Sequence, residues 1–209
     1  MPTISKKGNN IPPSPIRKLV PFADQAKKKG VDILHLNIGQ PDIKSPTESI
    51  DAIKNIELDI LKYEYSQGSY EFRNNLCKYY SNHNIHVLPD DIITTVGASE
   101  ALSFTLNSIC DPGDEVIIPA PYWVSYPDMV LLADGSPKIV PCSLDNNFIL
   151  QAEDLEKAIT KKTKWIILNS PSNPTGAGYS WSDMKKITDV LLRHPHVWVM
   201  TDDMYEHLV

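Results

Sequence analysis

From about residue 90 onward, apolar and polar positions follow two different periods. Short apolar runs, many of them β-branched, predict strands, and stretches whose apolar residues recur every three or four positions predict amphipathic helices. Strands and helices follow one another in turn. The expected strands are 91–96, 111–119 (after an opening turn), 137–142, 164–169 and 197–201, and the expected helices are 97–109, 122–134, 151–159 and 180–194.

This order predicts an α/β fold with a mostly parallel sheet and helices on both faces, because parallel strands need right-handed crossover connections. We expect the last strand, 197–201, to be buried on both sides. Ser180 and Asp183 fit an N-cap and its partner three residues on. The start of the chain differs, since five of the first 21 residues are proline. It predicts an extended arm and not a packed element.

Ligands of such sheets bind beyond the carboxyl ends of the strands, so the residues that follow each strand are candidates for function. A Gly-Ala-Ser turn at 97–99 follows the first expected strand, Trp123 the second, Asn173 the fourth and Asp202 the fifth. One crevice would then be lined by four features: small residues at a helix N-terminus, an aromatic ring, an amide on a rigid loop and a carboxylate. This set suits a phosphorylated, aromatic and cationic ligand.

Two of these candidates have a plain structural alternative. The free N–H groups at a helix start favour a phosphate, and Ser99 adds a hydroxyl, but many strand-to-helix turns hold glycine and serine for steric reasons. The Trp123 indole suits stacking on a flat ring, but it also suits packing in the core.

The candidate asparagine lies on a loop made rigid by proline. Pro171 and Pro174 restrict the backbone on either side of Asn173, so its amide is aimed and is able to donate to a phenolate oxygen. The alternative is a plain turn. Asn173 is no glycosylation acceptor, because Pro174 stands in the forbidden position.

Asp202 ends a strand that we expect to be buried. A buried carboxylate needs a cationic partner, and a protonated ring nitrogen would serve. Tyr205 is placed to offer its hydroxyl to the same ring. The alternative is a hard-metal site made by Asp202, Asp203, Glu206 and His207, which is disfavoured because adjacent residues leaving a strand point to opposite sides.

Composition narrows the classes of function. The net charge of −6 gives no indication of a nucleic-acid or anionic-membrane partner. The longest apolar runs are too short to cross a bilayer, and the N-terminus has no apolar signal-peptide core. The three cysteines follow no metal or disulfide pattern, which favours a reducing cytoplasm.

Six ordered motifs together resemble the fold-type-I, pyridoxal-phosphate-dependent aminotransferases, and most closely their class I aspartate/aromatic group. The resemblance implies a three-layer α/β/α fold, and transfer of an amino group between an α-amino acid and a 2-oxo acid. It further implies an arm and small-domain segment over 1–45 and part of a large cofactor-binding domain over 46–209. The motifs are HLNIGQPD (35–42), KYEYSQG (62–68), TVGASEAL (95–102), DPGDEVIIPAPYWVSYPDMV (111–130), NSPSNPTGAGYS (169–180) and TDDMYEHL (201–208).

The resemblance also implies a role for each matching residue in binding pyridoxal phosphate. Asp202 pairs with the pyridinium nitrogen, Asn173 and Tyr205 bond the ring's 3-oxygen, and Trp123 stacks on the ring. Trp123 and Asn173 also contact substrate, and Asp202 and Tyr205 are the catalytic residues. The phosphate contacts come from Gly97, Ala98 and Ser99.

Two further implied contacts lie earlier in the chain. Tyr63 reaches the phosphate of a neighbouring subunit, which implies a homodimer. Gly39 offers its backbone to the substrate carboxylate.

One residue that the resemblance requires has no match. The family's lysine, which forms the Schiff base with the cofactor, lies beyond the aspartate motif, and this sequence has no lysine after Lys186. We therefore expect an inactive N-terminal half, without the last two strands and the C-terminal small domain. The missing strands would leave a gap between 91–96 and 197–201, with exposed edges that make the chain marginally stable or prone to aggregate.

Two other functions remain open. Other fold-type-I enzymes, which catalyse C–S lysis, β-elimination or cyclisation, use the same first half. Alternatively, the chain is a truncated, non-catalytic module that dimerises with a relative through Tyr63 and the N-terminal arm.

Overall fold

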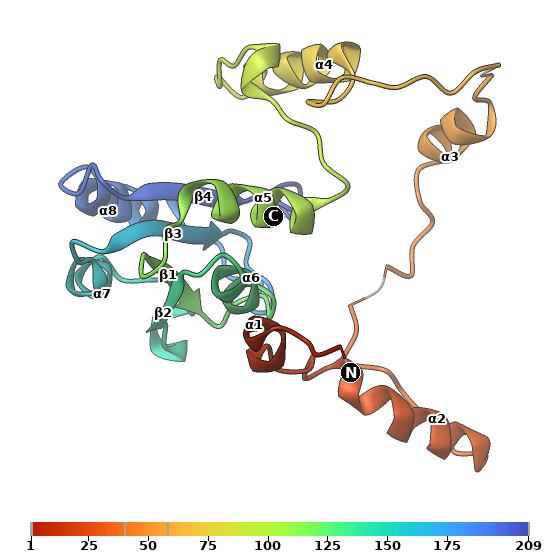
Figure 1. Cartoon of the computed structure of the whole chain (residues 1–209), viewed down its shortest axis with the longest axis horizontal. Helices are drawn as coiled ribbons and strands as arrows, with labels where there is room; N and C mark the ends of the chain where they lie inside the picture. The colour runs from red at the N-terminus through yellow and green to blue at the C-terminus, as the bar shows by residue number, and fades with distance from the viewer. Residues whose placement is uncertain (1, 40, 58, 209) are drawn as a thin grey trace. The chain divides into compact units, whose positions relative to one another are not determined.

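Figure 1 shows the computed structural model of the chain, which describes residues 2–39, 41–57 and 59–208. These residues form two compact units. One joins the residues up to Pro12 with those from Thr95 onward, and the other runs from Pro13 to Thr94. The predicted domain division between residues 45 and 46 stays a prediction.

The first unit contains a four-stranded, wholly parallel sheet, which confirms the predicted fold class. Its strand order is β2-β1-β3-β4. The register of β3 and β4 sets Asn169 opposite Asp202 at the carboxyl ends of the two strands. The strands are β1 (Glu115–Ala120), β2 (Ser136–Pro141), β3 (Thr163–Asn169) and β4 (Trp198–Asp202).

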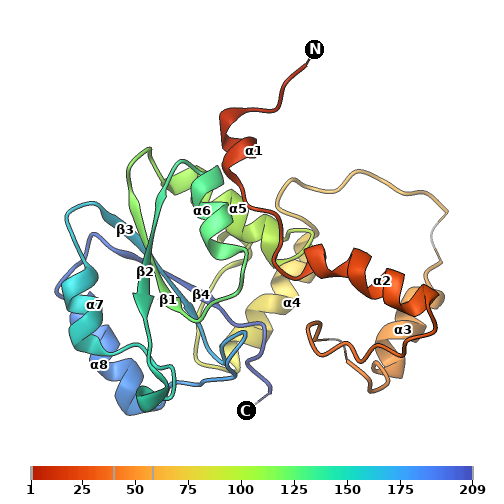
Figure 2. The same ribbon diagram turned by 90° about the horizontal axis from the view of Figure 1, so that it is seen from below.

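Helices cover both faces of this sheet (Figures 1 and 2). Side chains alternate along a strand, so Val116 and Ile118 pack on the face of α5 and α6, while Ile117 packs on the face of α7 and α8. The result is the predicted three-layer arrangement. The helices are α5 (Ala98–Ile109), α6 (Tyr126–Leu132), α7 (Ala152–Ala158) and α8 (Trp181–Leu191), with a short 3-10 turn η3 (Leu144–Asn146) after β2.

The start of α8 confirms the expected capping box. The Ser180 hydroxyl accepts from the backbone N–H of Asp183 at 3.2 Å, and the Asp183 carboxylate accepts from the backbone N–H of Ser180 at 3.3 Å. The hydrogen bond from the Ser180 side chain is the main reason that the pKa of Asp183 lies below its usual value. The helix that leads into β4 therefore begins at a well-defined residue.

Three predictions were wrong: the strand at 91–96, the burial of the last strand on both sides, and the extended N-terminal arm. Residues 91–96 form no strand: the turn η2 (Pro89–Asp91) is followed by extended chain, and among the described residues no strand pairs with it. The backbone N–H of Thr94 instead donates to the carbonyl oxygen of Gln67 at 2.9 Å. An apolar, β-branched run favours a strand, but a strand also requires a partner.

The last strand is not buried on both sides. β4 is an edge strand, with Trp198 55% and Val199 45% exposed. The N-terminal arm is not wholly extended either, since it contains α1 (Lys6–Asn10), the turn η1 (Arg17–Leu19) and the start of α2 (Val20–Lys28). None of these elements contains a buried residue.

The second unit consists of η1, α2, α3 (Thr47–Lys54), α4 (Tyr70–Ser81) and η2. Its one buried cation within the described residues is Arg73 on α4. The guanidinium donates to the carbonyl oxygens of Gly68, at 3.2 Å, and Pro89, and pairs with Asp90 at 3.4 Å. Arg73 thus joins the turn before α4 to the turn η2.

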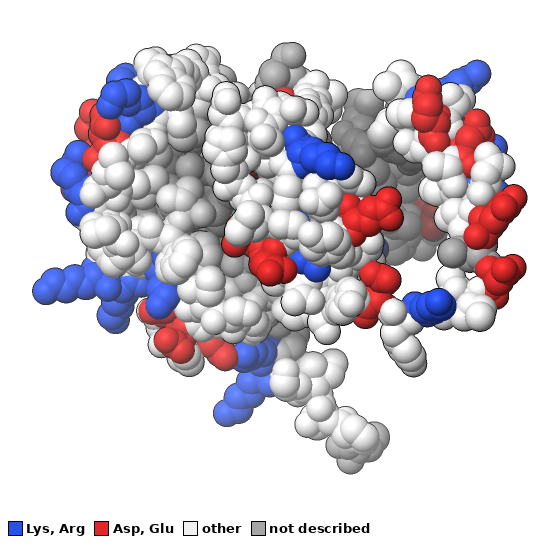
Figure 3. All heavy atoms as spheres, turned by 90° about the horizontal axis from the view of Figure 1, so that it is seen from above, with Lys and Arg blue, Asp and Glu red and all other residues white. Residues whose placement is uncertain are grey.

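The distribution of charged side chains on the surface agrees with the modest net charge of the chain. On the face in Figure 3, acidic and basic side chains are interspersed. No helix in the described part of the chain is long and apolar enough to cross a membrane.

Candidate functional site

A cavity of about 240 Å³ lies at the carboxyl edge of the sheet in the first unit. It brings together all the predicted site residues of that unit, namely Gly97, Ala98, Ser99, Trp123, Asn173, Asp202 and Tyr205. The other lining residues are Val96, Tyr126, Asn169 and Met204. Gly39 and Tyr63 belong to the second unit, so their expected contacts stay predictions.

One wall of the cavity is the N-terminus of α5. Gly97 is its N-cap and has φ +92°, a conformation that a residue with a side chain rarely adopts. The helix runs for 12 residues, so its first N–H groups and its dipole present a positive end to the cavity. Such an end favours a phosphate or carboxylate.

An aromatic pair forms the next wall, with Trp123 on the connection from β1 to α6 and Tyr126 at the start of α6. The rings of Trp123 and Tyr126 meet edge to face, with centroids 5.4 Å apart and planes at 80°. Trp123 is half-buried and packs against the core cluster on that face of the sheet. The indole therefore both contacts the core and lines the cavity, so the two interpretations of it do not exclude each other.

Asp202 lies at the end of β4, and its carboxylate is held by a neutral partner. The Tyr126 hydroxyl donates to Oδ2 at 2.7 Å, and the backbone N–H of Met204 lies 3.4 Å from Oδ1. Burial, followed by the hydrogen bond to Asp202, raises the pKa of Tyr126, so the phenol keeps its proton and acts as the donor. Asp202 therefore depends less on a cationic partner than the sequence suggests, because it is only half-buried and already accepts a hydrogen bond from Tyr126.

The lining of the cavity also includes the predicted amide and phenol. Asn173 Nδ2 lies 3.4 Å from the Tyr205 hydroxyl. The loop that carries Asn173 is closed by two backbone bonds, from the N–H of Ser172 to the oxygen of Ala177 and from the N–H of Gly176 to the oxygen of Ser172. Asn173 is therefore held in a defined turn while its amide is also directed to Tyr205, so this pair is able to donate to one ligand oxygen.

The arrangement fits pyridoxal phosphate by the chemistry of its groups. The start of α5 suits the phosphate, the Trp123 indole suits the flat ring, and the Asp202 carboxylate suits a protonated ring nitrogen. Asn173 and Tyr205 suit the ring oxygen. In the described residues, no group of three or more His, Cys, Asp and Glu side chains is arranged to hold a metal ion.

The family model for class I and II aminotransferases matches residues 31–209. The chain belongs to this aminotransferase family. Class I aminotransferases depend on pyridoxal phosphate, so the family and the cofactor class inferred from the motifs are confirmed.

The relatives of this aminotransferase chain are about twice as long. It is 45% identical over 210 residues to a probable aspartate/prephenate aminotransferase of Rickettsia felis, covering 100% of this chain and 51% of that protein. It is 43% identical to the aspartate/prephenate aminotransferase of Cereibacter sphaeroides, covering 95% of this chain and 50% of that one. The chain thus spans about half the length of the curated relatives it matches.

Solved structures agree with the fold. The aspartate aminotransferase of Rhizobium meliloti superposes with a TM-score of 0.92 at 39% identity, over 99% of this chain and 52% of that one. The enzyme of Thermotoga maritima gives 0.91 at 32% identity, over 99% and 55%.

Two polar residues of this aminotransferase site, Tyr126 and Asn169, were not predicted from the sequence. Tyr126 comes three residues after Trp123, in the first turn of α6, where the apolar pattern assigns it to the core. Asn169 is the last residue of β3. The only available signal was its place, because a polar residue that ends a buried parallel strand lies at the ligand-binding edge.

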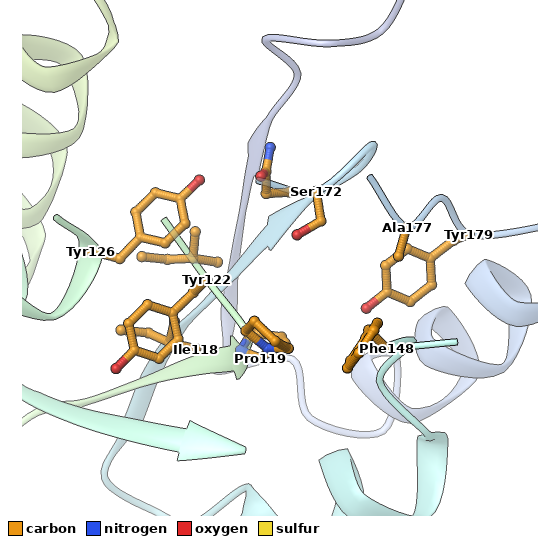
Figure 4. Close-up of a pocket in the computed structure, with 11 residues that line it drawn as sticks. Ile118, Pro119, Tyr122, Tyr126, Phe148, Ser172, Ala177 and Tyr179 are labelled. Carbon is orange, nitrogen blue, oxygen red and sulfur yellow. The ribbon is translucent and has the colours of Figure 1, made fainter. Parts of the chain in front are cut away.

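A second, smaller cavity of about 20 Å³ adjoins the same strand ends (Figure 4). Tyr122 and Tyr126 lie on one side of it and Phe148 and Tyr179 on the other. The Tyr179 hydroxyl accepts from the backbone N–H of Leu150 at 3.2 Å, and burial raises the pKa of this phenol to about 12. The space is about that of one water molecule, so the larger cavity is the candidate site.

Proposed function

We propose that the whole protein transfers an amino group between an α-amino acid and a 2-oxo acid with pyridoxal phosphate as cofactor. The observation that carries the proposal is the single cavity that joins the start of α5, Trp123, the Asn173–Tyr205 pair and Asp202. The relatives, which are named as aspartate/prephenate aminotransferases, support an aspartate/prephenate type of substrate.

Bound pyridoxal phosphate supplies an electron sink for the electrons released at the substrate α-carbon. Asp202 holds the proton on the ring nitrogen, and each unit by which it raises the pKa of that nitrogen corresponds to about 1.4 kcal/mol. Tyr126 donates to Oδ2 of the carboxylate and orients it. Asp202 and Tyr205 are the proposed catalytic residues of this chain.

The remaining residues bind and orient. Asn173 and Tyr205 hold the ring oxygen, Trp123 covers the ring face and contacts substrate with Asn173, and the turn of Gly97, Ala98 and Ser99 holds the phosphate.

The second unit supplies two further proposed contacts. Gly39 binds the substrate carboxylate, and Tyr63 binds the phosphate of a neighbouring subunit. The proposed Tyr63 contact makes the enzyme a homodimer, and we further propose that it is cytoplasmic and acts in amino acid biosynthesis.

We propose that the 209-residue chain has no turnover by itself. No lysine is among the described residues that line the cavity, and the last lysine in the sequence, Lys186, lies on α8. Pyridoxal phosphate added to the chain should therefore form no borohydride-trapped link to a lysine at this site.

The proposal is tested by binding pyridoxamine 5′-phosphate, which has no aldehyde and so does not react with surface lysines. Asp202→Asn should weaken binding by about tenfold to a hundredfold, because a hydrogen-bonded charge pair is lost. Asp203→Asn is the control, since that carboxylate bonds the Thr201 hydroxyl at 3.1 Å and does not line the cavity. Equal affinities of the wild type and Asp202→Asn would contradict the assignment.

Substrate class needs a separate assay on the intact enzyme. Steady transfer of the amino group of aspartate to a 2-oxo acid supports the proposal. Release of ammonia or of a sulfur leaving group without amino transfer would assign the protein to the other fold-type-I enzymes.

A further inference from the structure

The side chain of Asn169 joins the two residues that we propose to hold opposite edges of the cofactor ring. Its Nδ2 donates to the main-chain oxygen of Asp202 at 2.7 Å. Its Oδ1 accepts from the main-chain N–H of Asn173 at 2.7 Å. One planar amide thus bonds both the strand end that carries the carboxylate and the loop that carries the ring-oxygen amide.

The two bonds use both kinds of group that an asparagine side chain has. The donor and the acceptor sit on one rigid, planar unit, so the two backbone groups that they contact are held at a fixed separation. Leucine has a similar shape but neither group, and aspartate keeps only the acceptor.

Most of the local structure around Asn169 is held by bonds other than this bridge. β3 and β4 are joined by their own parallel ladder. The loop after β3 is closed by its own bonds between Ser172, Gly176 and Ala177. The bridge therefore adds little to the formation of either element, and what it sets is the position of the loop relative to the end of β4.

The place of Asn169 also agrees with a role in positioning. It is half-buried and, like Tyr126, lines both the larger cavity and the small one beside it. Tyr126 fixes the Asp202 side chain and Asn169 fixes the Asp202 backbone, so the carboxylate is held from two directions.

We infer that Asn169 is a positioning residue that sets the distance between the ring-nitrogen carboxylate of Asp202 and the ring-oxygen amide of Asn173. This inference rests on the proposed function. It assigns no contact with the cofactor to Asn169 itself, which acts through the two residues that it bridges.

The test compares two ligands on the wild-type chain and on Asn169→Leu. Pyridoxamine 5′-phosphate carries the ring nitrogen and the ring oxygen, whereas benzyl phosphate keeps only the phosphate, its methylene and the ring. Asn169→Leu should lower the affinity for pyridoxamine 5′-phosphate by about tenfold and change the affinity for benzyl phosphate by less than about twofold. Only the first ligand has the groups that the bridged residues contact. Equal losses for both ligands would show a merely structural role and overturn the inference.

A second measurement tests the bridge without any ligand. Amide hydrogen exchange at Asn173 should become at least about tenfold faster in Asn169→Leu, while exchange at Ile167 within β3 stays unchanged. Unchanged exchange at Asn173 would overturn the inference. The two measurements also distinguish the ways of failing. If exchange at Asn173 becomes faster in Asn169→Leu but the wild type binds both ligands equally, the bridge exists and the proposed function is wrong. The inference, which rests on that function, is then wrong as well.

Discussion

β3 and β4 are neighbouring parallel strands that both end at the candidate site, yet they differ in burial. Trp165, Ile166, Ile167 and Leu168 of β3 are all buried, whereas Trp198 and Val199 of β4 are about half-exposed at the edge of the sheet. One side of the site is therefore built on a firm central strand and the other on an edge strand. The edge side needs extra contacts to hold Asp202, and Tyr126 and Asn169 supply them.

The largest expected effect comes from truncating register partners on the two strands. Ile166 and Val199 lie opposite each other, but Ile166 has no exposed surface. Ile166→Ala should lower the free energy of unfolding by about 2–5 kcal/mol, and Val199→Ala by about 0.5 kcal/mol. Urea unfolding of both variants measures the difference, and equal losses would remove the contrast between centre and edge.

A smaller effect is expected from Tyr126→Phe, which removes the donor to Asp202. Affinity for pyridoxamine 5′-phosphate should fall by about tenfold, because the carboxylate loses its orienting bond. Tyr179→Phe is the matched control, since it also deletes a hydroxyl near the site, one that bonds only the backbone N–H of Leu150 among the described contacts. Calorimetric titration of both variants measures the affinity for pyridoxamine 5′-phosphate. An equal fall of affinity in both would show that Tyr126 has no special role.

The exposed edge of β4 should also make the chain self-associate, because an unpaired apolar edge offers its backbone groups to another strand. Sedimentation at rising protein concentration should show oligomers in the wild type and fewer in Val199→Lys. Leu144→Lys, an exposed apolar residue in η3 and outside the sheet, should change nothing. A wild type that stays monomeric and melts cooperatively would contradict this expectation.

The smallest effect concerns the helix that leads into β4. Folding lowers the pKa of Asp183, so this carboxylate contributes stability above its unfolded pKa and loses it as pH falls through the folded pKa. The wild type should therefore lose more stability than Asp183→Asn between about pH 6 and about pH 3. Parallel pH slopes of the two unfolding free energies would contradict the capping role.

Much of the fold follows from the sequence because periodicity is a local property. The four strands, the helices between them and the Ser180 cap were all predicted from it. Residues 91–96 were not, because an apolar run cannot tell whether a partner strand lies beside it. The pattern of β4 likewise predicted a strand buried on both sides. Its exposed edge was expected only from the two strands that the resemblance implies to be missing, since an edge is defined by neighbours and not by the strand's own residues.

The residues of the site likewise fall into those that the sequence predicted and those that it did not. Asp202 and Asn173 were predicted because each follows a strand, and the carboxyl-edge rule then places them together. Tyr126 and Asn169 were missed because their contacts join residues 76 and 33 positions apart. Such contacts depend on strand register and on which way the first turn of a helix faces, and neither is written in the local pattern.

Asp202 is proposed to keep the ring nitrogen of the cofactor protonated. Nitrogen NMR of pyridoxamine 5′-phosphate, labelled at the ring nitrogen and bound to the chain at neutral pH, tests it directly. We expect the chemical shift of a protonated pyridine in the wild type and of a neutral pyridine in Asp202→Asn. A neutral ring in the wild type, or the same protonated shift in both proteins, would contradict it.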